Sequence, residues 1–562
     1  MADEQDNLLH HPTPLPEKNA EQWIEKGSTF FKAKRYEEAL SAFEQALLLD
    51  VTSARGHNAK GLTLCRLKRY QEGLAACEQA LCLNPHYASP LINKSIALYD
   101  LKRYEEALAS CVAALQLPPT DPPTSYASDY HLKGLILFDL ERYEEALSAF
   151  EQALLLDASL DYAWNAKGNT LRQLDRYEEA LSSFAQALHL NPGFALAYAN
   201  RGSVLYRLKR YQEALADAEQ ALHFDPDEYI AYQIKGRCLQ AQQHHGEALL
   251  AYEQALALAD EDEEVSLALN DKANALYELD RYEEALAPSE QALHQGSPNE
   301  EAYTTKGNIL YALERYEEAL VAYEEALRLD PGNASFLFNK GLALCSLQRC
   351  EEALTIYQEA LRLAPNDAAI VRSKGSTLHD LKRYEEALVA YEETLRLEPT
   401  HADAWCNKGD TLRSLKRYEE ALAAYEQALL LEPTDASAWD SKGIVLYQLR
   451  RYEKALMAYA QALHLDSDDA VYAFHRGLAL HALKQYGEAL AAYEQTIGLK
   501  PEYAQAWYNK SLVLTALNRQ KEALDAQKKA VQLGFSLPQQ HTSGRWRPLR
   551  KLAGLLDRLI RR

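Results

Sequence analysis

The sequence has no apolar run long enough to span a membrane, and its acidic N-terminal stretch lacks the apolar core of a signal peptide. Positive charge is scarce, because 60 lysines and arginines stand against 82 aspartates and glutamates, for a net charge of −22. A surface with this excess of negative charge repels nucleic acid phosphates. We therefore expect no role on DNA or RNA.

Cysteine is also sparse and unpatterned. The eight cysteines form no CxxC pair, and no histidines stand at the spacing that completes a zinc site. Related segments of the chain carry aromatic residues at the places of Cys77 and Cys111, so we interpret the cysteines as small core residues in a reducing compartment. Together with the missing membrane signals, this favours the cytoplasm.

Catalytic motifs are missing as well. The chain contains no GxxxxGKS or GxGxxG phosphate loop, no HExxH zinc motif and no GxSxG nucleophile motif. The chain has many Glu-Glu pairs, but they recur at regular intervals. Such recurrence is typical of a solvated helix face. We expect no enzymatic activity, no cofactor and no metal.

One segment is repeated along almost the whole chain. Residues 35–50, RYEEALSAFEQALLLD, return unchanged at residues 142–157, and looser copies fill the rest. Aligning a small residue that precedes each such block gives fifteen copies, marked by Gly27, Gly61, Ser95, Gly134, Gly168, Gly202, Gly236, Ala273, Gly307, Gly341, Gly375, Gly409, Gly443, Gly477 and Ser511. Successive markers are 34 residues apart, except for 39 before Gly134 and 37 before Ala273.

Each copy has the pattern of two amphipathic helices. In the copy around Gly409, core residues recur at helical spacing before and after a short break: Trp405, Gly409, Leu412 and Leu415, then Tyr418, Ala421, Leu422, Tyr425, Ala428 and Leu429. Cations end the first helix and Glu419-Glu420 open the second, which suits both helix dipoles. Nine copies close with proline, which stops the second helix.

This pattern resembles the tetratricopeptide repeat, in which the aligned small residue is position 8. The copy around Gly168 matches at positions 4, 8, 20, 24, 27 and 32 with Trp164, Gly168, Ala180, Phe184, Ala187 and Pro192. The resemblance covers residues 20–537 and implies an all-α fold, a right-handed superhelix of antiparallel helix pairs with the first helices on the concave side. Position 7 departs from the family, because it carries Lys or Arg. The aliphatic part of such a side chain can pack against the protein while its charge reaches water.

The irregular places divide the chain into segments. We expect a flexible segment at residues 1–19, copies 1–3 at 20–121, copies 4–7 at 127–262 and copies 8–15 at 266–537. The proline-rich insertion at 122–126 is interpreted as a stiff loop, with a PxxP partner site as the alternative. The insertion at 263–265 and Pro288 inside a second helix suggest a hinge, with neutral drift as the alternative.

Residues 538–562 form a polar linker followed by a basic amphipathic helix. Leucines share one face of this predicted helix and arginines share the other. The helix either caps the last repeat or binds an anionic membrane or acidic partner, and the sequence alone leaves these alternatives open.

Binding of a protein or peptide partner is therefore the predicted function. The resemblance places binding on the concave side, at positions 2, 5, 6, 9, 12 and 13. No three consecutive copies carry the carboxylate clamp of chaperone-binding relatives, and the position-6 asparagines form only a broken ladder. The predicted partner-binding residues are Ile92, Ile96, Tyr99, Leu135 and Phe138 in copies 3 and 4; Asn165, Asn169, Arg172, Arg237, Asn274 and Asn308 in copies 5 to 9; and Asn339, Asn407, Phe474, Tyr508 and Asn509 further on.

Two other functions are compatible with the sequence. One is a membrane-peripheral assembly factor, tethered only through the basic C-terminal helix. The other is a regulatory subunit of a separate enzyme. The oligomeric state is not predicted by any feature of the sequence.

Overall fold

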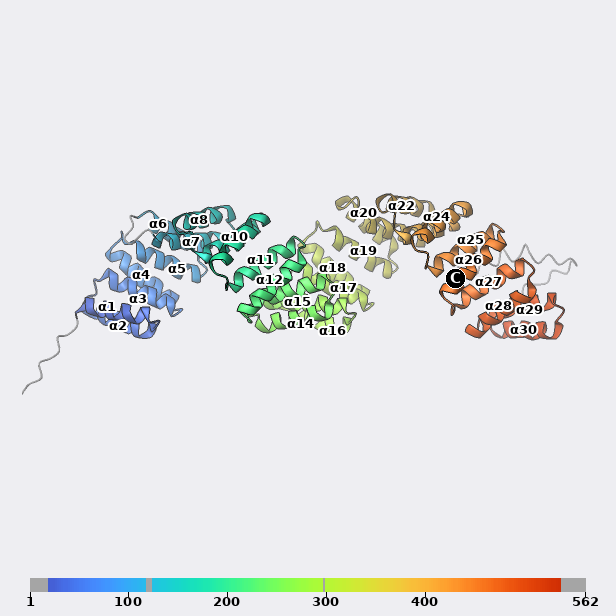
Figure 1. The fold of residues 1–562 in the computed structure, drawn as a ribbon, viewed down its shortest axis with the longest axis horizontal. Coiled ribbons are helices and arrows are strands. Elements are labelled where there is room, and N and C mark those ends of the chain that lie inside the picture. The colour runs from blue at the N-terminus through green and yellow to red at the C-terminus, as the bar shows by residue number, and fades with distance from the viewer. Residues whose placement is uncertain (1–18, 118–123, 297–298, 537–562) are drawn as a thin grey trace, which may run out of the picture. The chain divides into compact units, whose positions relative to one another are not determined.

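The structure is a computed structural model that describes residues 19–117, 124–296 and 299–536. Every regular element in these residues is an α-helix, and there are thirty of them. The chain divides into two compact units, Met1–Gly296 and Ser297–Arg562, which are described separately. Figure 1 labels the helices.

Helices come in consecutive pairs, two for each copy of the repeat. In the first unit they are α1 (Ala20–Lys32), α2 (Tyr36–Leu49), α3 (Ala54–Arg66), α4 (Tyr70–Leu83), α5 (Ala88–Asp100), α6 (Tyr104–Leu115), α7 (Thr124–Asp139), α8 (Tyr143–Leu156), α9 (Asp161–Gln173), α10 (Tyr177–Leu190), α11 (Ala195–Arg207), α12 (Tyr211–Phe224), α13 (Tyr229–Ala241), α14 (His245–Leu258), α15 (Asp262–Glu278) and α16 (Tyr282–His294). In the second unit they are α17 (Glu300–Ala312), α18 (Tyr316–Leu329), α19 (Ala334–Ser346), α20 (Cys350–Leu363), α21 (Ala368–Asp380), α22 (Tyr384–Leu397), α23 (Ala402–Ser414), α24 (Tyr418–Leu431), α25 (Ala436–Gln448), α26 (Tyr452–Leu465), α27 (Ala470–Ala482), α28 (Tyr486–Leu499), α29 (Ala504–Ala516) and α30 (Gln520–Gln532).

The turn inside each pair has the same backbone geometry. In the pair α23–α24, Lys416 has a φ of 62°, the left-handed conformation that ends a helix. The amide of Lys416 donates to the carbonyl of Arg413 at 2.9 Å, and the amide of Arg417 donates to the carbonyl of Leu412 at 2.9 Å. Each of the fifteen copies has one such non-glycine residue with positive φ at this place. The predicted helix hairpins are therefore confirmed.

The core of each pair is built on positions 8 and 24. A Cβ atom added to Gly168 would lie 2.7 Å from Cε1 of Phe184, so glycine lets the aromatic ring of the second helix approach the first helix. The phenyl ring of Phe184 is fully buried. Where position 8 is larger, position 24 is smaller, as in the pair Ala273 and Ser289. The two positions thus share one packing space.

The cysteines mostly behave as predicted. Cys77 and Cys111, at position 24 of their copies, are fully buried, and no disulfide is formed. Cys82 is exposed, so its interpretation as a core residue was wrong. It lies in the last turn of α4, on the side of that helix whose residues are exposed.

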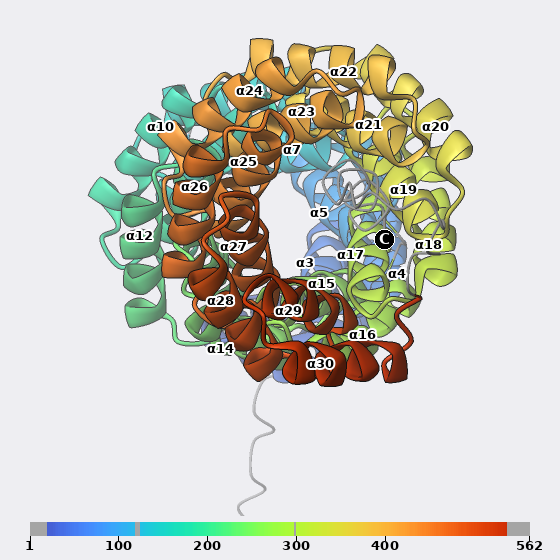
Figure 2. The ribbon, with the colours of Figure 1, turned by 90° about the vertical axis from the view of Figure 1, so that its right-hand side faces the viewer.

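First helices and second helices occupy different sides of each unit. Figure 2 shows, in the second unit, α19, α21, α23, α25, α27 and α29 nearer the middle and their even-numbered partners outside them. In both units most successive odd-numbered helices contact each other, for example α3 with α5 and α25 with α27, whereas successive even-numbered helices share no comparable contact in the described residues. The odd-numbered helices therefore line the inner face, as the family resemblance implies.

The insertions are partly helical. Helix α7 begins at Thr124, so the prediction of a loop over 122–126 was wrong for its last three residues, while 122–123 lie outside the described residues. Residues 263–265 lie within the first turns of α15, which contacts α14. A helix is favoured there because Asp262, Glu263 and Glu264 are acidic residues in a first turn.

The boundary between the two units does not coincide with the insertion at 263–265. It falls at Gly296, after α16, and α16 continues as one helix through Pro288. A hinge in copies 7 and 8 stays a prediction. The basic C-terminal helix and the N-terminal segment up to residue 18 lie outside the described residues.

Candidate partner-binding face

The inner face is the surface of the odd-numbered helices that neither their own even-numbered partners nor the adjacent copies cover. In copies 3 and 4 this face is apolar at positions 9 and 12. Ile92 and Tyr99 on α5 and Leu135 and Phe138 on α7 are half-buried and pack on one hydrophobic cluster, and Ile96 on α5 is also half-buried. These five predicted residues are thus brought together on two neighbouring helices.

The aromatic residues at position 12 are partly held by their own copy. The ring centroid of Tyr99 lies 5.6 Å from that of Tyr104, and the centroid of Phe138 lies 5.3 Å from that of Tyr143. The same pairing of positions 12 and 17 recurs in other copies, for example between Tyr447 and its neighbour on α26. Packing therefore uses one side of these rings and leaves the rest partly exposed.

His131 adds no charge to this apolar area. Its ring lies 5.4 Å from that of Phe150 and 4.7 Å from that of Tyr162, measured between centroids. Burial lowers the pKa of His131 to about 4, so the imidazole is neutral at neutral pH. The inner face of copies 3 and 4 is consequently suited to apolar side chains.

Polar side chains on the inner face join successive copies. The amide of Asn200 donates to the side-chain oxygen of Asn165 at 3.1 Å, linking α11 to α9. Arg237 on α13 pairs with Asp271 on α15, with Nη2 and Oδ2 3.1 Å apart. Each link runs from position 6 of one copy to position 5 or 9 of the copy before. Asn274 on α15 is half-buried near this area.

Arg172 differs from the other predicted arginine. Its Nε donates to Oδ1 of Asn169 at 2.9 Å, and both residues lie on α9. Among the described residues no carboxylate forms an ion pair with Arg172. The pKa of Arg172 is lowered, first by burial and then by the charge of Arg207.

The second unit repeats the asparagine links. The amide of Asn339 on α19 donates to the side-chain oxygen of Asn308 on α17 at 3.3 Å, and the hydroxyl of Tyr323 donates to the same oxygen at 2.9 Å. Asn407 on α23 is half-buried. Asn308 and Asn339 are therefore brought together, with their amides used inside the protein.

Three predicted partner-binding residues are buried against the protein itself. Phe474 is only 5% exposed, and its ring lies between those of Tyr493 and Tyr503 at centroid distances of 5.8 and 5.0 Å. Asn165 and Asn509 are also buried. We correct their assignment, because neighbouring helices cover their side chains and leave little surface for a partner.

Tyr508 is less enclosed. It is half-buried on α29 and stacks on Phe535 at a centroid distance of 4.5 Å. Its predicted role on the inner face stays a prediction.

Sequence reasoning missed a buried pair that joins copies 13 and 14. Nδ1 of His475 lies 2.8 Å from Oδ1 of Asp440, and both residues are less than a tenth exposed. The sequence did contain a signal for this pair, since the two residues occupy positions 5 and 6, where other copies carry paired asparagines.

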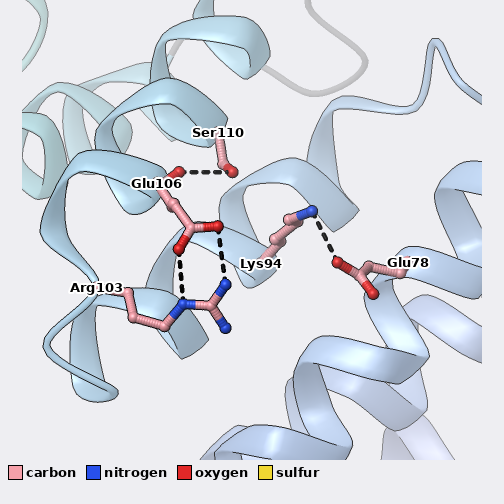
Figure 3. Close-up of polar contacts among 5 residues, drawn as sticks. All are labelled: Glu78, Lys94, Arg103, Glu106 and Ser110. Carbon is pink, nitrogen blue, oxygen red and sulfur yellow. Dashed lines mark hydrogen bonds and ion pairs between the residues drawn. The ribbon is translucent and has the colours of Figure 1, made fainter.

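It also missed the partner of the position-7 lysine. In Figure 3 the ammonium of Lys94 on α5 reaches Glu78 on α4 of the preceding copy, at 2.9 Å from Oε1, and Arg103 pairs with Glu106 within its own copy. The corresponding lysine is paired in the same way in seven other copies, for example Lys442 with Glu426 at 3.2 Å. The unusual position 7 therefore contributes an ion pair between copies, worth about 0.2–1 kcal/mol each at an exposed site.

The described residues hold no group of three or more His, Cys, Asp or Glu side chains placed to bind a metal ion. None of their helices combines the length and the apolar character that crossing a membrane requires.

Models of the tetratricopeptide repeat family match most of the chain. One matches residues 24–90, 165–229, 235–300, 304–368, 441–501 and 476–536, and three others match residues 127–159, 373–401 and 402–435. The chain belongs to the tetratricopeptide repeat family. Repeats of this family stack into scaffolds for protein–protein interaction, and this chain is such a scaffold.

Several solved structures are similar to the chain at low identity. The APC/C hetero-tetramer Cut9–Hcn1 is 15% identical, with 88% of this chain and 96% of that chain covered and a TM-score of 0.43. YrrB, described as a TPR protein with an unusual peptide-binding site, is 23% identical, with coverage of 36% and 97% and a TM-score of 0.29. A MamA fragment from Desulfovibrio magneticus RS-1 is 23% identical, with coverage of 30% and 94% and a TM-score of 0.29. No curated protein matches the chain.

Proposed function

We propose that the protein is a non-catalytic cytoplasmic scaffold that binds a protein or peptide partner on the inner face of its first helices. The observation that carries this proposal is the contrast between the two helices of each copy. The second helices are nearly the same throughout, whereas the inner positions of the first helices change from apolar in copies 3 and 4 to polar in copies 5 to 8. Structure alone requires no such variation, so we attribute it to a partner.

Exposed apolar side chains on the inner helices support this proposal. Tyr162 on α9 and Leu196 on α11 occupy position 2 and are 37% and 36% exposed, although the helices around them are well packed. Removing such side chains from water on binding contributes about 25 cal/mol for each Å² of apolar surface. An extended partner with apolar residues flanking polar ones would complement this area.

Changing two inner residues tests the proposal. In a Tyr162→Glu, Leu196→Glu double variant, we expect loss of the partners that co-purify with the wild-type protein, because charged groups would replace the apolar surface. Affinity purification from the native host with mass spectrometry measures this loss.

A matched variant on the outer helices is the control. Leu48 on α2 and Leu155 on α8 are 78% and 79% exposed, and a Leu48→Glu, Leu155→Glu variant adds the same charge outside the inner face. It should keep the partners. Retention of every partner by the inner variant, with unchanged helical circular dichroism, would contradict the proposal.

A further inference from the structure

Arg172 lies on the inner face as a cation without a counter-ion. Arg172 is half-buried, and the one side-chain hydrogen bond that it makes within the described residues goes to a neutral amide, that of Asn169. A partly buried charge is costly unless it is paired. Arg172 therefore retains hydrogen-bond donors and a positive charge that the described protein does not satisfy.

Copy 12 provides an internal comparison, because it carries arginine at the same position. Arg413 on α23 is equivalent to Arg172, and Asp410 is equivalent to Asn169. Nη2 of Arg413 lies 2.7 Å from Oδ1 of Asp410, which also accepts a hydrogen bond from the hydroxyl of Tyr425 at 2.8 Å. Burial acts to lower the pKa of Arg413, but Tyr425 and Asp410 outweigh it and raise the pKa. Exchange of Asp for Asn is thus what leaves Arg172 uncompensated.

The neighbouring copy increases the positive charge. Position 12 of one copy faces position 13 of the next: the hydroxyls of Tyr311 and Ser346 lie 3.1 Å apart, and a hydrogen bond from Tyr99 reaches Asp139. At copies 5 and 6 this place holds Arg172 and Arg207, two like charges. The charge of Arg207 lowers the pKa of Arg172, and Arg207 itself is exposed at the end of α11.

We propose that Asn169, Arg172 and Arg207 form a binding site for one carboxylate group of an extended partner peptide, an inference that rests on the proposed function. A carboxylate between the two guanidinium groups would relieve their repulsion and accept charge-assisted hydrogen bonds, bidentate from at least one of them. The amide nitrogen of Asn169 is a further donor, since its oxygen already accepts from Arg172.

The surroundings restrict the ligand to an isolated acidic group. The chain carries a net charge of −22, so its surface as a whole repels a polyanion. The apolar area of copies 3 and 4 lies on the same unit, directly before the helix pair α9–α10 that carries Arg172. The site therefore fits a peptide that combines apolar residues with a single aspartate, glutamate or chain-terminal carboxylate.

Peptide arrays test this site with the full-length protein. Two arrays carry random octapeptides with blocked ends that differ only in a central residue, fixed as Glu in one and as Gln in the other; a third has central Gln and a free C-terminal carboxylate. The wild-type protein should bind the Glu array about ten-fold more strongly than the Gln array, as expected for one charged hydrogen-bonding group. Preference for the third array over the second would identify a chain terminus as the source.

An Asn169→Asp variant is the decisive comparison. It reproduces the arginine–aspartate pair of copy 12, which the fold tolerates. The variant should therefore bind the Glu and Gln arrays about equally. Arg207→Gln, at an exposed position, should reduce the preference for Glu in part. Asp410→Asn changes the equivalent residue in copy 12 and should not reduce it.

The outcomes separate this inference from the proposed function. Equal binding of all three arrays by the wild-type protein, or a preference for the carboxylate-bearing arrays that stays undiminished in the Asn169→Asp variant, would overturn the carboxylate site alone. Absence of binding to all three arrays would overturn the inner-face function with it.

Discussion

A Gly477→Ala variant is expected to lose about 2 kcal/mol of local stability in copy 14, within the range for overpacked cores. An added Cβ would lie 2.6 Å from Cε1 of Tyr493. The tyrosine ring is fully buried and lies against Phe474, so it cannot move aside. This steric cost exceeds the roughly 1 kcal/mol that alanine gains over glycine in a helix.

Hydrogen exchange is the suitable measurement, because repeat arrays open locally and one global unfolding energy is not well defined for them. Amides of α27 and α28 should exchange faster in the variant. Gly487→Ala is the matched control in the same copy: this glycine is exposed on α28 and no atom lies within 4 Å of an added Cβ. It should slow exchange in α28, and faster exchange in both variants would refute the packing explanation.

The same packing argument predicts that the cost of Gly477→Ala depends on Tyr493. Copy 8 carries Ala273 with Ser289, and copy 3 carries Ser95 with Cys111, so a larger position 8 accompanies a smaller position 24. Tyr493→Ser should itself destabilise by about 3–5 kcal/mol. In that background Gly477→Ala should cost nothing, and an unchanged cost in the double-mutant cycle would rule out the shared space.

A Pro288→Ala variant is expected to stabilise α16 by up to about 3 kcal/mol. Proline inside a helix lacks the amide that would donate to the carbonyl four residues before it, and its ring crowds that carbonyl. Pro288 lies inside α16 and is half-buried. Alanine restores the hydrogen bond, so hydrogen exchange in α16 should slow.

The matched control, Pro501→Ala, is expected to change stability in the opposite direction. Pro501 lies in a turn between α28 and α29, where proline mainly restricts the unfolded chain. Its replacement should cost about 0.4–1 kcal/mol. A loss of stability in both variants would show that α16 depends on Pro288, which would contradict the argument from helix geometry.

Much of the fold could be predicted from the sequence because the repeat imposes it. The fixed spacing of Gly409, Tyr425 and their equivalents defines two helices and their contact in every copy, and the structure confirms both. The turn residue, such as Lys416, was not predictable from its type, since lysine does not favour a positive φ. Its conformation follows from the closing of the hairpin.

The candidate site was less predictable, because the sequence shows which positions face inward but not how deeply each side chain is covered. Phe474 was predicted as an apolar residue that binds a partner, yet Tyr503, directly before α29, covers it. Arg172 and Arg237, at positions 12 and 9 of their copies, were both predicted to bind a partner. The pairing of Arg237 with Asp271 occupies one of these two guanidinium groups inside the protein, and that pairing depends on contacts between copies.

The most direct test of the inner-face proposal is site-specific photo-cross-linking in living cells. A photoreactive amino acid is placed at residue 196 on α11 in one variant and at residue 155 on α8 in another, where the native leucines are both exposed. We predict a cross-linked partner from residue 196 and none above background from residue 155. A partner cross-linked from residue 155 but not from residue 196 would contradict binding on the inner face.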